Sequence, residues 1–223
     1  MNIWNSINYH LREKINILLG PIRLKRIRSE YRDFTLISNN CWGGHVYRYF
    51  KLPYNSPTVG MYFFADDYIR FVSSLEKYLS LEIEMISAKE SNHYSELLAN
   101  HKDSLDKPIG RLDDVEIVFL HCNTAEEAKL KWTRRTSRVN LNNVIVKMSE
   151  MNGCTKEHLK AFDNLQYERK FVFVTRDYKL RSQVIFKEYE GKDEIKNDTT
   201  LFRKYINLEN LINGQPFKKK QRV

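Results

Sequence analysis

Apolar residues follow two patterns along this chain, and the patterns separate predicted strands from predicted helices. Short runs of β-branched and aromatic residues are typical of buried strands, whereas apolar positions that recur every three or four residues mark one face of a helix. Strands are predicted over 34–37, 58–64, 81–86, 115–120, 144–148, 170–175 and, at a sheet edge, 183–188. Helices are predicted over 2–19, 22–32, 45–50, 66–79, 125–137, 155–165 and 198–213.

Strands and helices of similar length alternate in the second half of the chain. This order is typical of βαβ units with parallel strands. Thr124 and Glu127 supply a capping box for the helix over 125–137. We therefore predict an α/β fold in three layers around a mainly parallel, Rossmann-like sheet, and we expect the polar segment 88–107 to be a flexible insertion.

The chain divides into an amphipathic helical extension (1–32), a single α/β domain (33–213) and a basic tail (214–223). Apolar side chains from Trp4 to Leu18 lie on one helical face, and Gly20-Pro21 is expected to end that helix. This face can lie in a membrane interface. The alternative is that it contacts the body of the protein or a second subunit.

The formal net charge of +9 is concentrated at the two ends of the chain. Residues 1–32 carry +5 and residues 218–222 carry +4, which leaves 33–217 neutral. A nucleic-acid-binding protein would carry its charge on the folded body, so no specific nucleic acid partner is expected. Basic ends suit an anionic membrane surface, where each basic residue contributes about 1 kcal/mol.

The remaining composition narrows the cellular setting. Three scattered cysteines without a CxxC pair indicate neither a disulfide framework nor structural zinc. The sequence shows no run of eighteen apolar residues and no signal peptide pattern, so we expect a cytoplasmic protein, peripheral at the inner face of the cell membrane. The adjacent pairs Asp66-Asp67 and Asp113-Asp114 are not a DxD motif, so no divalent metal is indicated.

The turn over residues 38–45 contains more polar and reactive side chains than a purely structural turn needs. A strand followed by glycines and a helix N-terminus favours anion binding, because free N–H groups and the helix dipole point at the ligand. The alternative is structural, with Asn39 or Asn40 capping the helix and Trp42 filling the core. The candidate substrate-binding residues here are Asn39, Asn40, Trp42, Gly43, Gly44 and His45.

Three polar clusters follow predicted strands, over 39–45, 121–124 and 175–177. Because ligand crevices of parallel sheets lie outside the strand carboxyl ends, we expect the clusters to form one site, with Asp177 among its substrate-binding residues.

Glycosyl transfer from a nucleotide sugar onto a glycan is the first hypothesis for this site. Arg135 and Arg138, on one face of a basic helix with Lys131, would neutralise the pyrophosphate. Either His121 or Asp67 would act as the base that activates an acceptor hydroxyl. The alternative for the arginines is a solvated basic face, and Asp66 is expected to cap its helix.

Two further hypotheses use the same residues differently. Cys41 lies at a predicted helix N-terminus, where a thiol is a better nucleophile, and with His121 or His45 it could form an acyltransferase or hydrolase. Alternatively Cys41 is an ordinary buried cysteine. A non-catalytic, membrane-associated scaffold or glycan-binding subunit would explain the basic ends without any catalytic residue.

Six segments of this chain, which include the turn over 38–44 and the helix residues 127–138, resemble a bacterial family labelled "exopolysaccharide biosynthesis protein", formally the domain of unknown function 1919. The resemblance implies a setting in surface or capsular glycan assembly and implies no particular reaction. Where the family often has His-Tyr, this chain has His121-Cys122. The matching segments are 38–44, 52–60, 67–69, 108–110, 119–121 and 127–138.

Overall fold

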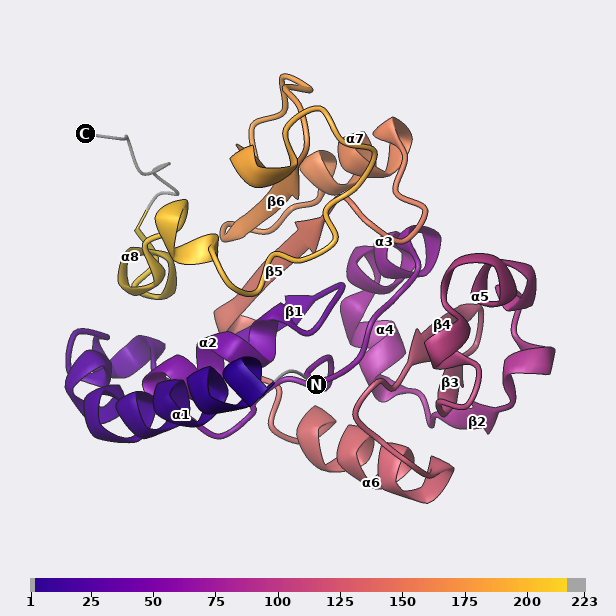
Figure 1. Cartoon of the computed structure of the whole chain (residues 1–223), viewed down its shortest axis with the longest axis horizontal. Helices are drawn as coiled ribbons and strands as arrows, with labels where there is room; N and C mark the ends of the chain where they lie inside the picture. Colours follow the sequence, from indigo (N-terminus) through magenta and orange to yellow (C-terminus); the bar gives the residue numbers. More distant parts are fainter. Residues whose placement is uncertain (1–2, 216–223) are drawn as a thin grey trace.

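The computed structural model describes residues 3–215, and of residues 3–13 only the backbone (Figure 1). Its larger sheet has four parallel strands in the order β1-β5-β6-β7. The α/β fold with a mainly parallel sheet is therefore confirmed, with β7 at the predicted edge. The strands are β1 (Thr35–Ser38), β5 (Val144–Ser149), β6 (Lys170–Val174) and β7 (Gln183–Ile185).

Alternate side chains of these strands enter two different cores, which gives the three layers. One row contacts α2 (Trp42–Phe50) and α8 (Leu208–Ile212), and the other contacts α3 (Ala65–Ser73) and α7 (Lys156–Asn164). The first row contains Leu36, Ile145, Phe171 and Phe173, and the second contains Ile37, Val146, Met148, Val172 and Val174.

A second, antiparallel sheet of three strands is inserted between β1 and β5, and lies on the right of Figure 1. The expectation that residues 115–120 belong to the parallel sheet is therefore wrong. β4 forms a hairpin with β3, and Asp113 in the connecting turn has a positive φ of 57°, as primed hairpin turns require. The elements here are α4 (Leu75–Ser80), β2 (Glu84–Ile86), α5 (Tyr94–Asn100), β3 (Ile109–Leu112) and β4 (Val115–Val118).

Residues 56–64, which we call the strap, connect the two sheets. The predicted strand over 58–64 is wrong, because the strap makes only an isolated bridge, Tyr62 to Val118. Its backbone N–H and carbonyl groups instead form hydrogen bonds with several neighbouring segments. Phe63 donates to the Asn39 carbonyl at 3.1 Å, and the Gly60 carbonyl accepts from His121 at 3.3 Å. The strap thereby brings His121 to the end of β1.

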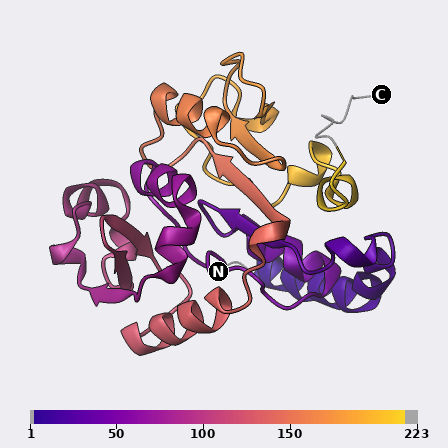
Figure 2. The same cartoon turned by 180° about the vertical axis from the view of Figure 1, so that it is seen from behind.

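Helix α1 (Ile3–Leu24) continues through Gly20-Pro21, so the predicted end of the helix and the second helix over 22–32 are both wrong. Packing accounts for the continuation, because α1 lies along α2 in both views of the cartoon (Figures 1 and 2). A Cβ atom on Gly20 would approach the Lys51 Cβ to 2.7 Å, so glycine allows this close approach. Beyond α1, residues 25–32 contain only a 3-10 turn at Ser29–Tyr31.

Other boundaries differ in smaller ways. The predicted helix over 66–79 is interrupted at Ser74, and the segment 88–107 contains α5, whose Leu97 is fully buried. Helix α6 (Ala125–Thr136) begins as predicted, because Thr124 accepts a hydrogen bond from the Glu127 N–H. The further 3-10 turns are Ala88–Glu90, Lys102–Ser104, Leu141–Asn143, Lys187–Tyr189 and Phe202–Lys204.

Several predicted features of the termini lie outside the described residues. They are the side chains of Trp4, Ile7 and Leu11 and the basic residues 218–222. In the part of the chain that the structure describes, no helix combines the length and the apolar character needed to cross a bilayer.

Candidate functional site

Backbone N–H groups in the first turn of α2 already have acceptors within the protein, so they do not form the anion site that the sequence predicts. The Trp42 N–H donates to the Asn40 side chain at 3.2 Å, and the Gly43 N–H donates to the Ser38 hydroxyl at 3.4 Å. The Gly44 N–H donates to the Cys41 carbonyl at 3.2 Å. A phosphate at this helix end would find these donors occupied.

The two glycines, Gly43 and Gly44, are helical and have no positive φ. They are buried at close contacts between layers. A Cβ on Gly43 would lie 3.1 Å from a Leu36 methyl group, and one on Gly44 would lie 3.1 Å from a Val59 methyl group. Their role in the structure is therefore to let α2 approach β1 and the strap.

A fully buried ion pair lies beneath this turn, and the sequence prediction missed it. Lys147 on β5 binds the Asp198 carboxylate, and neither side chain is more than 1% exposed. Asn40 bridges the pair, accepting from the Lys147 ammonium at 2.9 Å and donating to Asp198 at 3.0 Å. Ser149 donates to the same carboxylate at 2.6 Å. A lysine inside the otherwise apolar strand 144–148 was the available signal.

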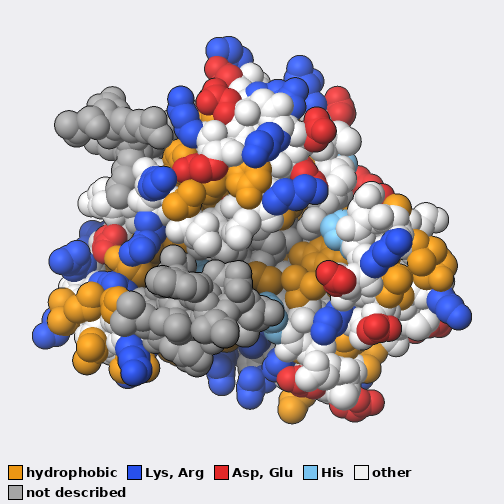
Figure 3. Space-filling view, viewed as in Figure 1, with side chains coloured by type: hydrophobic (Ala, Val, Ile, Leu, Met, Phe, Trp, Pro, Cys, Tyr) orange, Lys and Arg blue, Asp and Glu red, His pale blue; other side chains and the backbone are white. Residues whose placement is uncertain are grey.

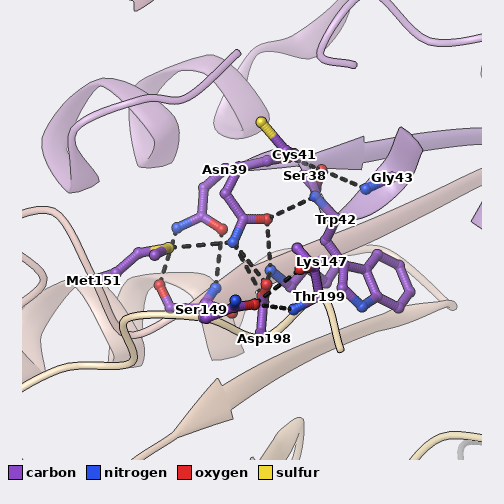
Figure 4. A network of polar contacts seen from close by, with 12 residues as sticks. Ser38, Asn39, Cys41, Trp42, Gly43, Lys147, Ser149, Met151, Asp198 and Thr199 are labelled. Carbon is purple, nitrogen blue, oxygen red and sulfur yellow. Dashed lines mark hydrogen bonds and ion pairs between the residues drawn. The ribbon is translucent and has the colours of Figure 1, made fainter. Parts of the chain in front are cut away.

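Figure 4 shows this network, with the Cys41 sulfur directed away from it. Burial lowers the pKa of Lys147, and the Asp198 carboxylate opposes that effect. Burial alone would raise the pKa of Asp198, but the lysine charge and three hydrogen bonds lower it. The pair therefore stays ionised and neutral in sum, which is the arrangement that a dry interior tolerates.

Cys41 and His121 meet across the gap between the two sheets, as the hypothesis of a shared site expects. The Cys41 Sγ lies 3.7 Å from the His121 Nε2. Burial and, to a smaller extent, the nearby Asp198 carboxylate raise the pKa of Cys41 to about 11, against the opposing charges of Lys147 and Arg48. Burial and the charges of Arg48 and Lys131 lower the pKa of His121. At neutral pH the pair is therefore a thiol beside a neutral imidazole.

One pocket beside this pair is strongly basic, and we call it the cationic pocket. It has a volume of about 440 Å³ and no acidic side chain among its lining residues. Arg135 is only 8% exposed, and its guanidinium donates to the Val59 carbonyl at 2.5 Å and lies over the Tyr54 ring. The basic and imidazole side chains of the pocket are His45, Arg48, His121, Lys131 and Arg135.

A larger chamber of about 750 Å³ adjoins the cationic pocket, and the two share Cys41 and His45 as lining residues. Its charged side chains are partly compensated, since Glu194 pairs with Lys196 and Asp198 pairs with Lys147. Neutral hydrogen-bonding side chains supply much of the remaining lining: Asn40, Asn100, Ser104, Asn152, Asn197 and Thr199. The two cavities therefore differ in charge and suit different ligands.

The structure separates several predicted site residues from these cavities. Asp67 is buried on α3, where it accepts from Arg70 and His93, each at 2.5 Å. Arg138 follows the end of α6 and is exposed, and Asp177 forms an exposed pair with Lys179. None of these three residues lines the cationic pocket or the chamber.

Two residues of the 38–45 turn have structural partners. Asn39 bridges β1 and β5, donating to the Ser149 carbonyl at 2.9 Å and accepting from its N–H at 3.0 Å. Trp42 is fully buried and makes edge contacts with Phe171 and Phe202. Asp66, expected to cap α3, pairs with His158 instead.

The described residues contain no group of three or more His, Cys, Asp or Glu side chains that could hold a metal ion. The basic side chains that an anion would meet in the cationic pocket are Arg48, Lys131 and Arg135.

Comparison with known proteins shows a family match over most of the chain. The family described as "Domain of unknown function (DUF1919)" matches residues 15–214. An "Uncharacterized protein" of Haemophilus influenzae strain Rd is 29% identical over 196 residues, which is 87% of each chain. The family match includes β1, the strap, α6 and the segment that supplies Asp198.

Proposed function

We propose, from the premise that the chain belongs to the DUF1919 family, that it is a group transferase of surface-glycan assembly that binds a phosphate-activated sugar donor. A nucleotide sugar is the donor we put forward first. The exopolysaccharide or capsular setting rests on the resemblance of segments such as 38–44 to proteins with that label. The reaction is argued from the cavities alone.

The cationic pocket is the observation that supports this function. Buried arginine is costly unless a partner compensates its charge, yet Arg135 has a carbonyl and an aromatic ring beside it and no carboxylate among the described residues. Arg48 and Lys131 line the same pocket, and Lys131 also pairs with Glu127 at 2.6 Å. A diphosphate would compensate the charge of Arg135 through the hydrogen bonds that arginine makes to phosphate oxygens.

His121 is the residue we assign to proton transfer. Its lowered pKa keeps the imidazole neutral at neutral pH, which is the state that accepts a proton. In the proposed step His121 takes the proton of an acceptor hydroxyl, and that oxygen forms a bond to the anomeric carbon. The bond from this carbon to the diphosphate oxygen breaks, and Arg135 and Lys131 stabilise the charge on the leaving diphosphate.

A thermal-shift measurement tests the donor site. Nucleotide sugars and nucleoside diphosphates are expected to raise the melting temperature of the wild-type protein, because a ligand at a hundred times its Kd stabilises by about 2.7 kcal/mol. Arg135→Gln should lose this shift. Arg134→Gln, on the same helix but exposed, is the matched control and should retain it. Equal shifts in both variants, or none in the wild type, would remove the proposal.

The Cys41–His121 contact of 3.7 Å favours a second candidate, acyl transfer or hydrolysis through a thiolate. The raised pKa of Cys41 opposes it, since a catalytic thiolate needs a lowered one. Cys41→Ser separates the two functions. It should abolish an acyl transfer and leave a glycosyl transfer, with His121 intact, largely unchanged.

We propose peripheral binding of the protein to the cytoplasmic face of an anionic membrane, as the basic ends favour. On α1, Ile15, Leu18 and Ile22 are exposed at spacings of three and four residues, so they form one apolar stripe. A non-catalytic scaffold or glycan-binding subunit would use the same stripe. Absence of turnover by the wild-type protein, together with glycan binding that His121→Asn leaves unchanged, would favour that reading over catalysis.

A further inference from the structure

The cationic pocket opens beside a smaller cavity of different character, which we call the apolar groove. The groove has a volume of about 330 Å³ and lies between α1 and the residues that follow α2. Ile17, Leu52 and Pro53 line it, and Arg48 and Tyr54 line both the groove and the cationic pocket. A ligand that places an anion in the pocket therefore has an apolar channel at one side of it.

The outer end of the groove reaches the exposed surface of α1. Of the eight large hydrophobic side chains that are exposed in the described part of the chain, five lie within residues 15–22. Ile17 belongs both to this surface and to the groove, and is 52% exposed. No acidic residue occurs between positions 14 and 29, whereas five basic ones do. Figure 3 shows basic and hydrophobic side chains interspersed over this end of the molecule, at the lower left.

The cationic pocket, the apolar groove and the exposed apolar surface of α1 thus follow one another from the interior of the protein to its surface. We propose that the phosphate-bearing substrate of this protein is an amphiphile, a diphosphate linked to an isoprenoid-like chain. Its diphosphate binds in the cationic pocket, the first carbons of its chain lie in the apolar groove, and α1 lies on the membrane that holds the rest of the chain. This inference rests on the proposed function, because it takes the cationic pocket as the diphosphate site.

The groove suits a hydrocarbon chain better than a nucleoside. A base presents donors and acceptors that need partners once they leave water. The side chains of Ile17, Leu52 and Pro53 offer none, and those of Arg48 and Lys51, which also line the groove, are donors only. Its amide Asn16 already accepts a hydrogen bond from Arg23 at 2.8 Å. A hydrocarbon chain needs no such partners, and its contact with Ile17, Leu52 and Pro53 removes apolar surface from water.

Calorimetric titration of the full chain with three soluble probes tests the inference. The probes are farnesyl diphosphate below its micelle concentration, inorganic pyrophosphate and uridine diphosphate, with farnesol as the control that lacks the diphosphate. We expect farnesyl diphosphate to bind at least tenfold more tightly than pyrophosphate. Ile17→Ser, at a half-exposed position, should lose most of that tenfold gain and leave pyrophosphate binding unchanged. Arg135→Gln should weaken both ligands, and Arg134→Gln should weaken neither.

The outcomes separate the two proposals. If uridine diphosphate and pyrophosphate bind but the farnesyl chain adds nothing, the amphiphile inference falls and the proposed function stands. If farnesol binds as tightly as farnesyl diphosphate, the cationic pocket plays no part and the inference is equally wrong. If none of the three phosphates binds, both proposals fail together. Tight farnesyl diphosphate binding without uridine diphosphate binding would support the amphiphile and replace the nucleotide sugar as donor.

Discussion

Lys147 holds a full positive charge inside the core, compensated by one carboxylate from a distant part of the chain. Removing one partner of a buried ion pair leaves the other charge without compensation, at a cost of about 3–5 kcal/mol. We expect Lys147→Met to lower the free energy of unfolding by that amount, as measured by urea denaturation. The double variant Lys147→Met, Asp198→Leu should recover part of the loss. A loss below about 1 kcal/mol in the single variant would contradict this view of the pair.

Cys41 provides a second test at the scale of one residue. With a pKa of about 11, its thiolate fraction at pH 8 is roughly two-hundredfold below that of an ordinary cysteine with a pKa near 8.5. Alkylation of Cys41 by iodoacetamide at pH 8 should therefore be slower than that of free cysteine by at least this factor. Mass spectrometry of the labelled peptide gives the rate. Rapid labelling would indicate an activated thiolate and would favour the acyl-transfer candidate.

The sequence predicted the meeting of Cys41 with His121 but for a partly wrong reason. It assumed that both follow strands of one parallel sheet, whereas the strap and the second sheet bring His121 there. Lys131 and Arg135 also lie where a basic helix face predicts them, and Arg138 does not, because α6 ends at Thr136. The partner of Lys147 was out of reach, since an isolated sequence does not show that Asp198 returns to β5.

At the scale of elements, Asp67 links α3 to His93 just before α5. Burial alone would lower the pKa of His93, but the hydrogen bond and charge of Asp67 raise it. The protonated histidine therefore stabilises the fold fully below its unfolded pKa near 6.5, and this contribution disappears as the pH rises through the folded pKa. His93→Gln should reduce the free energy of unfolding more at pH 5.5 than at pH 9. Equal losses at the two pH values would assign the effect to packing on Phe64 alone.

Contact between α1 and α2 gives another prediction at this scale. An alanine at position 20 would place its Cβ within 2.7 Å of the Lys51 Cβ and near the α2 backbone. We expect Gly20→Ala to cost about 1–3 kcal/mol and to loosen α1 from α2, despite the better helix propensity of alanine. Hydrogen exchange of the α1 amides measures the loosening. The control is Leu19→Ala, on the exposed face of α1. A second glycine such as Gly191 is not a suitable control, because its positive φ is itself unfavourable for alanine.

Local patterns predicted most elements, and tertiary contacts decided the rest. The strands over 34–37, 144–148 and 170–175 are apolar and β-branched, and the structure confirms them. The strap is equally rich in such residues but connects two sheets, so the same pattern there gives no ladder. Gly20-Pro21 is a strong local stop signal, and packing against α2 overrides it.

At the scale of the whole molecule, the apolar stripe of α1 predicts binding to anionic vesicles. Leu18 is 72% exposed on α1, and Leu130 is 66% exposed on α6 at a place without the apolar stripe. Leu18→Glu should reduce sedimentation with vesicles of phosphatidylcholine and phosphatidylglycerol at least severalfold. Leu130→Glu carries the same charge change and should bind like the wild type. A similar loss in both variants would show that the change in net charge alone weakens binding, and would argue against insertion of α1.

The late position of Asp198 has a consequence for how this protein is made. The carboxylate that neutralises Lys147 is separated from it by 51 residues and follows all the strands. During synthesis the parallel strands therefore leave the ribosome before their central charge can be buried. A nascent chain that stops before residue 198 should stay loosely packed and sensitive to protease around β5. Completion of the core would then wait until the segment that follows β7 has emerged.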